Sequence, residues 1–140
     1  GVDRTFLSIM AASYKEEALE GGDSRVVLSL PPVLAPVKAC IMPLVKKDGL
    51  PEKAREIMNE LKFDFKCGYD EKDSIGKRYR RQDAVGTPFC ITVDHQTLED
   101  NCVTIRHRDS MQQERVAIAD LHKIIGDAVN MKNLFRKIVG

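Results

Sequence analysis

Apolar and polar positions alternate along the middle of the chain with two different periods, which predicts strands and helices in turn. Residues 37–45, VKACIMPLV, are apolar on both faces, as is typical of a strand inside a sheet that is covered on both sides. Residues 51–62, PEKAREIMNELK, place Pro51 in a first helical turn. The apolar residues of this segment recur at helical spacing at Ala54, Ile57, Met58 and Leu61. A strand followed by a helix predicts the start of a βαβ unit.

The next two segments continue this alternation. Residues 63–69, FDFKCGY, predict a second strand. Ser74 is a suitable N-cap for a helix that continues to Val85 and ends at Gly86. The sequence therefore predicts a second strand and helix pair.

The C-terminal part predicts more strands and a closing helix. Residues 88–94 and 101–107 predict two strands joined by a polar turn, and residues 115–120 predict a third. Residues 121–129 have the spacing of an amphipathic helix, and residues 134–138 form a weaker helical run. Together these segments predict an α/β fold, a mixed sheet flanked by helices.

The N-terminal part has a different pattern. Residues 3–19 place Phe6, Ile9 and Met10 on one face of a predicted helix. Residues 21–36 contain two glycines, the β-rich VVLSL and the proline-rich PPVLAP, which predicts a connector between residues 1–20 and a main domain at 37–140. Because the first residue is glycine and not methionine, we expect a piece of a longer protein.

Composition narrows the functional classes. The chain has 22 basic and 21 acidic residues, so an RNA partner would have to be held by local basic clusters. Its four cysteines are spaced too widely for metal ligation and are expected to be buried, reduced thiols. No metal site, glycine-rich phosphate loop or serine nucleophile motif is present in the sequence. No apolar run approaches the ~20 residues that span a bilayer, so we expect a cytoplasmic protein with no membrane partner.

One basic cluster lies on the helix predicted to follow Ser74, around a narrow apolar stripe of Ile75, Tyr79 and Val85. The members of the cluster are Lys77, Arg78, Arg80 and Arg81. Four cations in five positions repel one another, so other charges should compensate. Two interpretations are equally supported: the cations pair with the nearby acids Asp70, Glu71, Asp73 and Asp83, or they bind the phosphates of a nucleic acid.

A second polar cluster lies where two predicted strands meet, at residues 106–116, RHRDSMQQERV. Its charged and amide residues are Arg106, Arg108, Asp109, Gln112, Gln113, Glu114 and Arg115. Guanidinium groups stack on unpaired bases, carboxylates accept from the amino group of cytosine, and amides pair with base edges. The cluster is therefore a candidate surface for reading single-stranded bases, and mutually paired surface charges are the alternative.

The first residues carry a third candidate. In GVDRT, the order of Gly1, Asp3 and Arg4 at a predicted helix start would place a guanidinium near a nucleotide phosphate. An ordinary capped helix start is the alternative.

Taken in order, four blocks of the sequence resemble the C-terminal part of the dimeric class II glycyl-tRNA synthetases. The blocks are GVDRTFLSIM, LPPVLAPVKACIMPLVKKDGLPEKAREI, YDEKDSIGKRYRRQDAVGTPFCITVD and DNCVTIRHRDSMQQERV. The resemblance covers most of residues 1–10 and 26–121. It implies an anticodon-binding domain of about five strands and three helices, preceded by a helix left from the catalytic domain. It also identifies Gly1, Asp3 and Arg4 with motif 3, whose arginine contacts ATP.

The resemblance implies a function for each cluster. The parent enzyme would attach glycine to its tRNA with ATP and Mg²⁺, as a homodimer held largely by its catalytic domain. This chain holds no complete catalytic set, so we expect it to be inactive and monomeric by itself and to recognise the tRNA anticodon. Arg106, Arg108, Asp109, Gln112, Glu114 and Arg115 would read the anticodon bases. Lys77, Arg78, Arg80 and Arg81 would bind tRNA phosphates.

Two other functions are compatible with the sequence. The same fold occurs in a non-catalytic accessory subunit of the mitochondrial DNA polymerase, although the GVDRT element argues against that role. Strand and helix alternation also permits a flavodoxin-like domain, but residues 44–51 offer only one glycine for a phosphate-binding loop.

Overall fold

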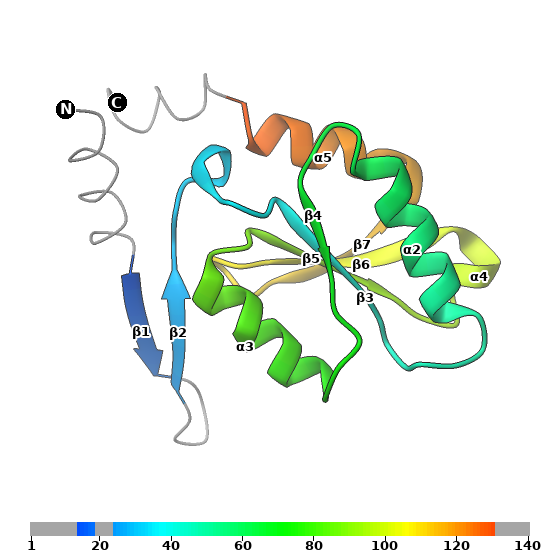
Figure 1. The fold of residues 1–140 in the computed structure, drawn as a ribbon, viewed down its shortest axis with the longest axis horizontal. Coiled ribbons are helices and arrows are strands. Elements are labelled where there is room, and N and C mark those ends of the chain that lie inside the picture. The colour runs from blue at the N-terminus through cyan, green and yellow to red at the C-terminus, as the bar shows by residue number, and fades with distance from the viewer. Residues whose placement is uncertain (1–13, 19–23, 131–140) are drawn as a thin grey trace.

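The computed structural model describes residues 14–18 and 24–130, and in them a five-stranded mixed sheet lies between helices, beside a separate two-stranded sheet (Figure 1). The strands are β1 (Tyr14–Ala18), β2 (Ser24–Leu28), β3 (Ala39–Pro43), β4 (Cys67–Tyr69), β5 (Phe89–Val93), β6 (Cys102–His107) and β7 (Gln113–Ala117). The helices are α2 (Leu50–Leu61), α3 (Ile75–Val85), α4 (Thr97–Asp100) and α5 (Leu121–Ala128), with short 3-10 turns η2 (Pro32–Leu34) and η3 (Ile118–Asp120). The α/β fold predicted from the sequence is confirmed.

The large sheet has the strand order β4-β3-β5-β6-β7. β3 pairs in parallel with both β4 and β5, whereas β6 and β7 are antiparallel additions at one side. One row of paired residues, Cys67, Ala39, Phe89 and His107, crosses four strands. The turn between β6 and β7 therefore lies at the edge of the sheet where the parallel strands begin.

Two layers of helices cover the sheet because its central strands are apolar on both faces. On one face, called the α2/α5 face, Ala39 and Ile41 of β3 pack in a core with the buried residues of α2 and α5. On the other, called the α3 face, Cys40 and Met42 pack with Cys90 beneath α3. α3 does not extend over the whole of its face, and Thr104, Gln113 and Arg115 of β6 and β7 remain partly or fully exposed there.

α3 begins and ends where the sequence predicts. The Ser74 side chain accepts a hydrogen bond from the Lys77 amide, which satisfies one of the free N–H groups of the first turn. The helix ends at Gly86, whose φ of 85° lies in the left-handed region. A side chain there would also meet the Leu28 carbonyl of β2 at 3.0 Å, so glycine allows close contact between α3 and β2.

Replacing Ser74 tests this cap. We expect Ser74→Ala to lower the free energy of unfolding by about 1 kcal/mol, because an amide at the helix start loses its acceptor. Ser74→Asp retains an acceptor and should keep the wild-type value in urea unfolding followed by circular dichroism. Equal losses for both variants would contradict a capping role.

The structure corrects the prediction of one helix over residues 3–19. Residues 14–18 form strand β1, which pairs antiparallel with β2, while residues 1–13 lie outside the described part. The partner strand β2 falls inside the predicted connector and buries Arg25 and Val27. Pairing with a second strand is a tertiary effect, and here it overrides the helical spacing of the local sequence.

Three smaller predictions also differ from the structure. The second strand spans only residues 67–69, and the preceding residues turn, which leaves Phe63 82% exposed. The polar turn after β5 contains the one-turn helix α4. Val85, expected on an apolar stripe of α3, is exposed, and that helix buries Arg78 and Asp83 instead. The helical run at 134–138 lies outside the described residues.

The four cysteines are free thiols, as predicted, but Cys67 and Cys102 are only partly buried. Cys40 and Cys90 are register neighbours on β3 and β5 and both are buried. Burial raises the pKa of Cys40 to about 12 and that of Cys67 to about 11, so both thiols stay protonated and unreactive at neutral pH. Within the described residues, no helix is long and apolar enough to cross a membrane.

Candidate nucleic-acid interface

Strand alternation turns Arg106 inward. Arg106 is the register partner of Cys90, so its side chain lies on the α3 face, beneath the helix. Its two terminal nitrogens donate to the two carboxylate oxygens of Asp83 at 2.8 and 3.1 Å. Its guanidinium carbon lies 4.7 Å from the centre of the Tyr79 ring. The guanidinium group of Arg106 is therefore bound by partners inside the domain.

Arg108 is also an internal residue. Its Nη1 and Nη2 atoms donate to the carbonyl oxygens of Gly86 and Leu30, at 2.8 and 2.6 Å. Its Nε donates to Asp109 at 2.9 Å. These bonds join the β6–β7 turn to the end of α3 and to the segment after β2.

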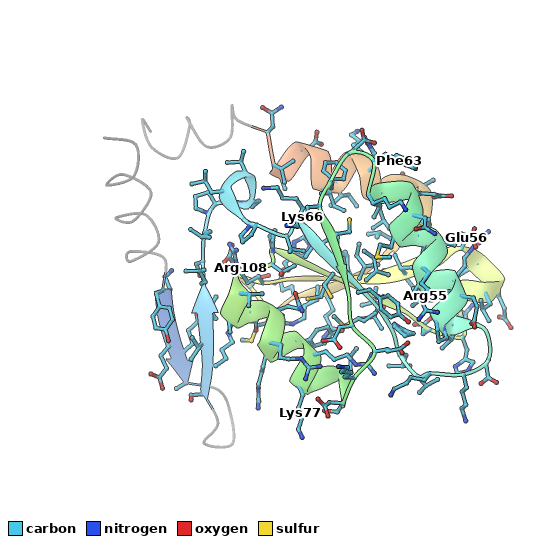
Figure 2. The ribbon with its side chains drawn as sticks, viewed as in Figure 1. Arg55, Glu56, Phe63, Lys66, Lys77 and Arg108 are labelled. Carbon is cyan, nitrogen blue, oxygen red and sulfur yellow. The ribbon has the colours of Figure 1, made fainter. Side chains whose placement is uncertain are left out.

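The basic cluster on α3 likewise contains a buried member as well as exposed ones. Arg78 is buried and donates to the carbonyl oxygens of Pro43, Glu71, Lys72 and Asp73. Arg81 is exposed and bridges Asp70 and Asp73 at 2.8 and 2.7 Å. Lys77 and Arg80 are exposed, and Figure 2 shows Lys77 on the side of α3 that points away from the sheet. The pairing interpretation thus holds for Arg81, whereas Arg78 is bound by backbone carbonyls instead of acids. Phosphate binding by Lys77 and Arg80 stays a prediction.

Burial removes three arginines from the predicted contact surface. Arg78, Arg106 and Arg108 are 3%, 5% and 2% exposed. A guanidinium that is enclosed and hydrogen-bonded on several sides cannot also stack on a base or meet a phosphate without breaking those bonds. We therefore exclude these three residues as RNA contacts.

Strand β7 sends its polar residues to opposite faces. Register pairing places Gln113 beside Arg106 and Arg115 beside Thr104, both on the α3 face. Glu114 pairs with Ile105 and so lies on the α2/α5 face. There it contacts His107 at 3.2 Å, beside a polar hollow lined by His107, Gln112, Gln113 and Glu114. Glu114 and Arg115 therefore cannot approach one base from the same side.

Arg115 is held by two carboxylates on the exposed part of the α3 face. Its Nη1 lies 3.0 Å from Asp94, and its Nη2 lies 3.1 Å from Asp100 and from the Cys102 carbonyl. Hydrogen bonds with Asp100 and Asp94 raise the pKa of Arg115. Partial burial opposes ionisation of Asp94, but hydrogen bonds from Arg115 and Thr97 lower its pKa overall, and hydrogen bonding with Arg115 lowers the pKa of Asp100. The group is thus a fixed, fully ionised array of donors and acceptors.

Sequence reasoning missed Asp94 and Asp100. Asp94 follows β5 and Asp100 ends α4, so they precede Arg115 by 21 and 15 residues and meet it only through strand pairing. It also missed a hollow beside the β4 edge lined by Arg55, Tyr69, Asp70, Glu71, Lys72 and Arg81. In this hollow the Arg55 guanidinium lies 5.0 Å from the centre of the Tyr69 ring. No local pattern in the sequence pointed to either arrangement.

Two further predictions concern metal ions and ATP. Among residues 14–18 and 24–130, no group of three or more His, Cys, Asp or Glu side chains could hold a metal ion. Gly1, Asp3 and Arg4, the predicted ATP-contacting element, lie outside the described residues.

The fold is a mixed α/β domain with an exposed polar surface beside α3, and comparison identifies its family. Residues 38–127 match the anticodon binding domain family, and the chain belongs to that family. Similarity to individual proteins within the family gives a more specific result. The chain is 51% identical to the glycine–tRNA ligase of Borrelia hermsii over 125 residues, which cover 89% of this chain and 28% of that protein.

Two clostridial relatives carry the same name. The chain is 57% identical to the glycine–tRNA ligase of Clostridium perfringens over 129 residues, covering 89% of this chain and 27% of the relative. It is 54% identical to that of Clostridium tetani, covering 92% of this chain and 27% of the relative. The chain therefore spans just over a quarter of the length of these relatives. They confirm the resemblance to glycyl-tRNA synthetases and give no support to the polymerase-subunit alternative.

Proposed function

We propose that this chain recognises the anticodon loop of a glycine tRNA through the exposed part of its α3 face. The observation that carries the proposal is Arg115, an exposed guanidinium fixed by Asp94 and Asp100 on an open sheet surface of an anticodon-binding domain. A preorganised group of this kind loses little conformational entropy when it meets a base.

The residue types suit the expected bases. Glycine anticodons end in two cytosines, and the Watson–Crick edge of cytosine presents an amino donor, a ring-nitrogen acceptor and a carbonyl acceptor. Asp94 or Asp100 can accept from the amino group, while Arg115 and Gln113 can donate to the carbonyl. Asp109, Gln112 and Glu114 lie at the turn and on the α2/α5 face, and we assign them to adjoining nucleotides of the loop.

The exposed cations of α3 suit the RNA backbone. Lys77 and Arg80 lie along the helix that borders the open surface, and we assign them to phosphates. Arg81 is left out of this assignment because Asp70 and Asp73 already bind its guanidinium. Such contacts give affinity that falls as salt rises, because bound phosphates release counterions. Bases would thus be read on β7 and phosphates bound on α3.

We further propose that the domain works within a glycine–tRNA ligase. The names of its relatives support this activity, in which glycine is activated with ATP and Mg²⁺ and then transferred to tRNA. Gly1, Asp3 and Arg4 would belong to the ATP site of such an enzyme, which we expect to be a homodimer. A role in protein synthesis would place it in the cytoplasm.

Replacing Arg115 tests the reading surface. We expect Arg115→Ala to lose about 1–3 kcal/mol of discrimination between an anticodon stem-loop with the glycine anticodon and one with both cytosines replaced by uridine. The reason is that the variant removes a base donor and releases the two carboxylates that it orients. Binding of both RNAs would be measured by fluorescence anisotropy at fixed salt.

Arg55→Ala is the matched control, because it removes the same charge from α2, beside the opposite edge strand β4. It should lower the affinity for both stem-loops equally, if at all. Equal discrimination by wild type and Arg115→Ala would contradict the proposed reading surface.

A further inference from the structure

Three buried charged side chains meet where β2, α3 and β6 come together. They are Arg25 from β2, Asp83 from α3 and Arg106 from β6, and we call them the buried ion triad. Their elements are widely separated in sequence, and one of them belongs to the small β1–β2 sheet outside the main sheet. Proteins seldom bury charges unless each is paired, so the geometry of this group must be closely fitted.

Asp83 is the centre of the triad. Arg106 donates to both of its oxygens, and Arg25 Nη1 donates to Oδ2 at 3.1 Å. Across β1 and β2, Glu17 is the register partner of Arg25 and accepts from its Nε and Nη2 at 2.9 and 2.6 Å. Two guanidinium groups thus face two carboxylates, and their charges balance. The β1–β2 sheet supplies one charge of each sign.

The triad also reaches the turn between β6 and β7. The same Nη1 atom of Arg25 donates to the carbonyl oxygen of Arg108 at 2.8 Å. Arg108 in turn donates to Gly86 and Leu30, and its own amide donates to the Pro88 carbonyl at 3.0 Å. Figure 2 shows Arg108 at the end of α3 that lies nearest to β2. One side chain of the small sheet therefore holds the residue at which the turn begins.

We propose that Arg25 is a positioning residue through which docking of the β1–β2 sheet is coupled to RNA binding at β6 and β7. Arg25 touches no base in this proposal. It fixes Asp83, and hence Arg106 on β6, next to the reading strand β7, and it fixes the backbone at Arg108. By linkage, undocking of the small sheet weakens RNA binding, and bound RNA strengthens docking by the same factor.

This inference rests on the proposed RNA-binding function, but it also makes a claim about the protein without RNA. A residue that stabilised only its own strand would, when replaced, loosen β1 and β2 and leave the β6–β7 turn unchanged. Replacement of a positioning residue would loosen both the β1–β2 sheet and the β6–β7 turn. The amides of His107 and Met111, which donate to the Gln112 and His107 carbonyls, report on the turn.

Hydrogen exchange of these amides tests the coupling in Arg25→Met, which keeps an apolar stem but loses every donor. We expect the turn amides and the β2 amides to exchange at least about fivefold faster than in wild type, while the central β3 amides keep their rates. Affinity for the glycine anticodon stem-loop should fall by a similar factor. Lys15→Met, which removes an exposed charge from β1, is the control and should change neither.

The outcomes separate this inference from the proposed function. Faster exchange confined to β1 and β2, with wild-type rates in the turn and wild-type RNA affinity, would overturn it. If the wild-type chain binds no stem-loop, the proposed function fails, and exchange in the turn alone then decides whether Arg25 positions it. If Arg25→Met does not fold, Glu17→Gln weakens the same anchor from its half-exposed side, and it should raise exchange in the turn to a smaller extent. Unchanged exchange in the turn of that variant would overturn the inference.

Discussion

Asp83→Ala is expected to lower the free energy of unfolding by about 3–5 kcal/mol, the range found when one partner of a buried ion pair is removed. The loss is large because Asp83 is fully buried and accepts hydrogen bonds from two guanidinium groups, Arg25 and Arg106. Without it, the buried Arg106 loses its carboxylate partner in a medium that solvates the charge poorly, and Arg25 keeps only Glu17. Urea unfolding followed by circular dichroism would measure the change.

Two comparisons show whether the buried charges cause this loss. Asp73→Asn removes a carboxylate of the same helix region whose Arg81 pair is exposed, so it should change stability little. Asparagine also tolerates the left-handed backbone of this residue, whose φ is 64°. Replacing all three members of the triad with apolar residues, Arg25→Met, Asp83→Leu and Arg106→Met, should restore much of the stability, because no unpaired charge remains buried and Glu17, which loses Arg25, is half-exposed. An Asp83→Ala variant as stable as Asp73→Asn would show that the buried charges contribute little.

Arg78→Met is expected to destabilise the domain by about 3 kcal/mol, since each hydrogen bond to a buried charged group contributes about 1.5–3 kcal/mol. Arg78 donates to carbonyl oxygens at the end of β3 and in the segment before α3. Its loss leaves those carbonyls without their donor and loosens the segment that presents Lys72 and Asp73. Thermal and urea unfolding would measure the loss.

The neighbouring cation gives the matched control. Lys77 is exposed on α3, so Lys77→Met should leave the stability unchanged and weaken binding of every anticodon stem-loop alike. The salt dependence of stem-loop binding by this variant should also become shallower, by the equivalent of about one phosphate contact. If Arg78→Met kept full stability and only lost RNA affinity, Arg78 would be a phosphate contact and its internal role would be refuted.

Several elements could be predicted from the sequence because their signals are local. Pro51 and the helical spacing after it mark α2, while Ser74 and Gly86 mark both ends of α3. A helix cap acts within one turn of chain, so a short stretch of sequence contains all the residues involved. Residues 39–43 are apolar on both faces of their strand, which likewise predicts a sheet with other elements packed on both faces.

The candidate site could be predicted only in part. The residues of the 106–116 cluster do gather at one turn, as their sequence proximity requires. How these side chains divide between the two faces of the sheet could not be predicted, because a side chain in a strand points to one face or the other according to register. Arg106 faces α3, Glu114 faces α2 and α5, and Arg115 meets Asp94 and Asp100 from segments that precede β6.

The sequence by itself determined the α/β class, the limits of α2 and α3, and the family to which the chain belongs. Only the tertiary structure decided which cations are available to a ligand. In the sequence Lys77 and Arg78 are adjacent and equivalent, but in the structure Lys77 points to solvent and Arg78 is buried. The physical reason is that burial depends on what packs against a side chain, and here the packing partners come from distant parts of the chain.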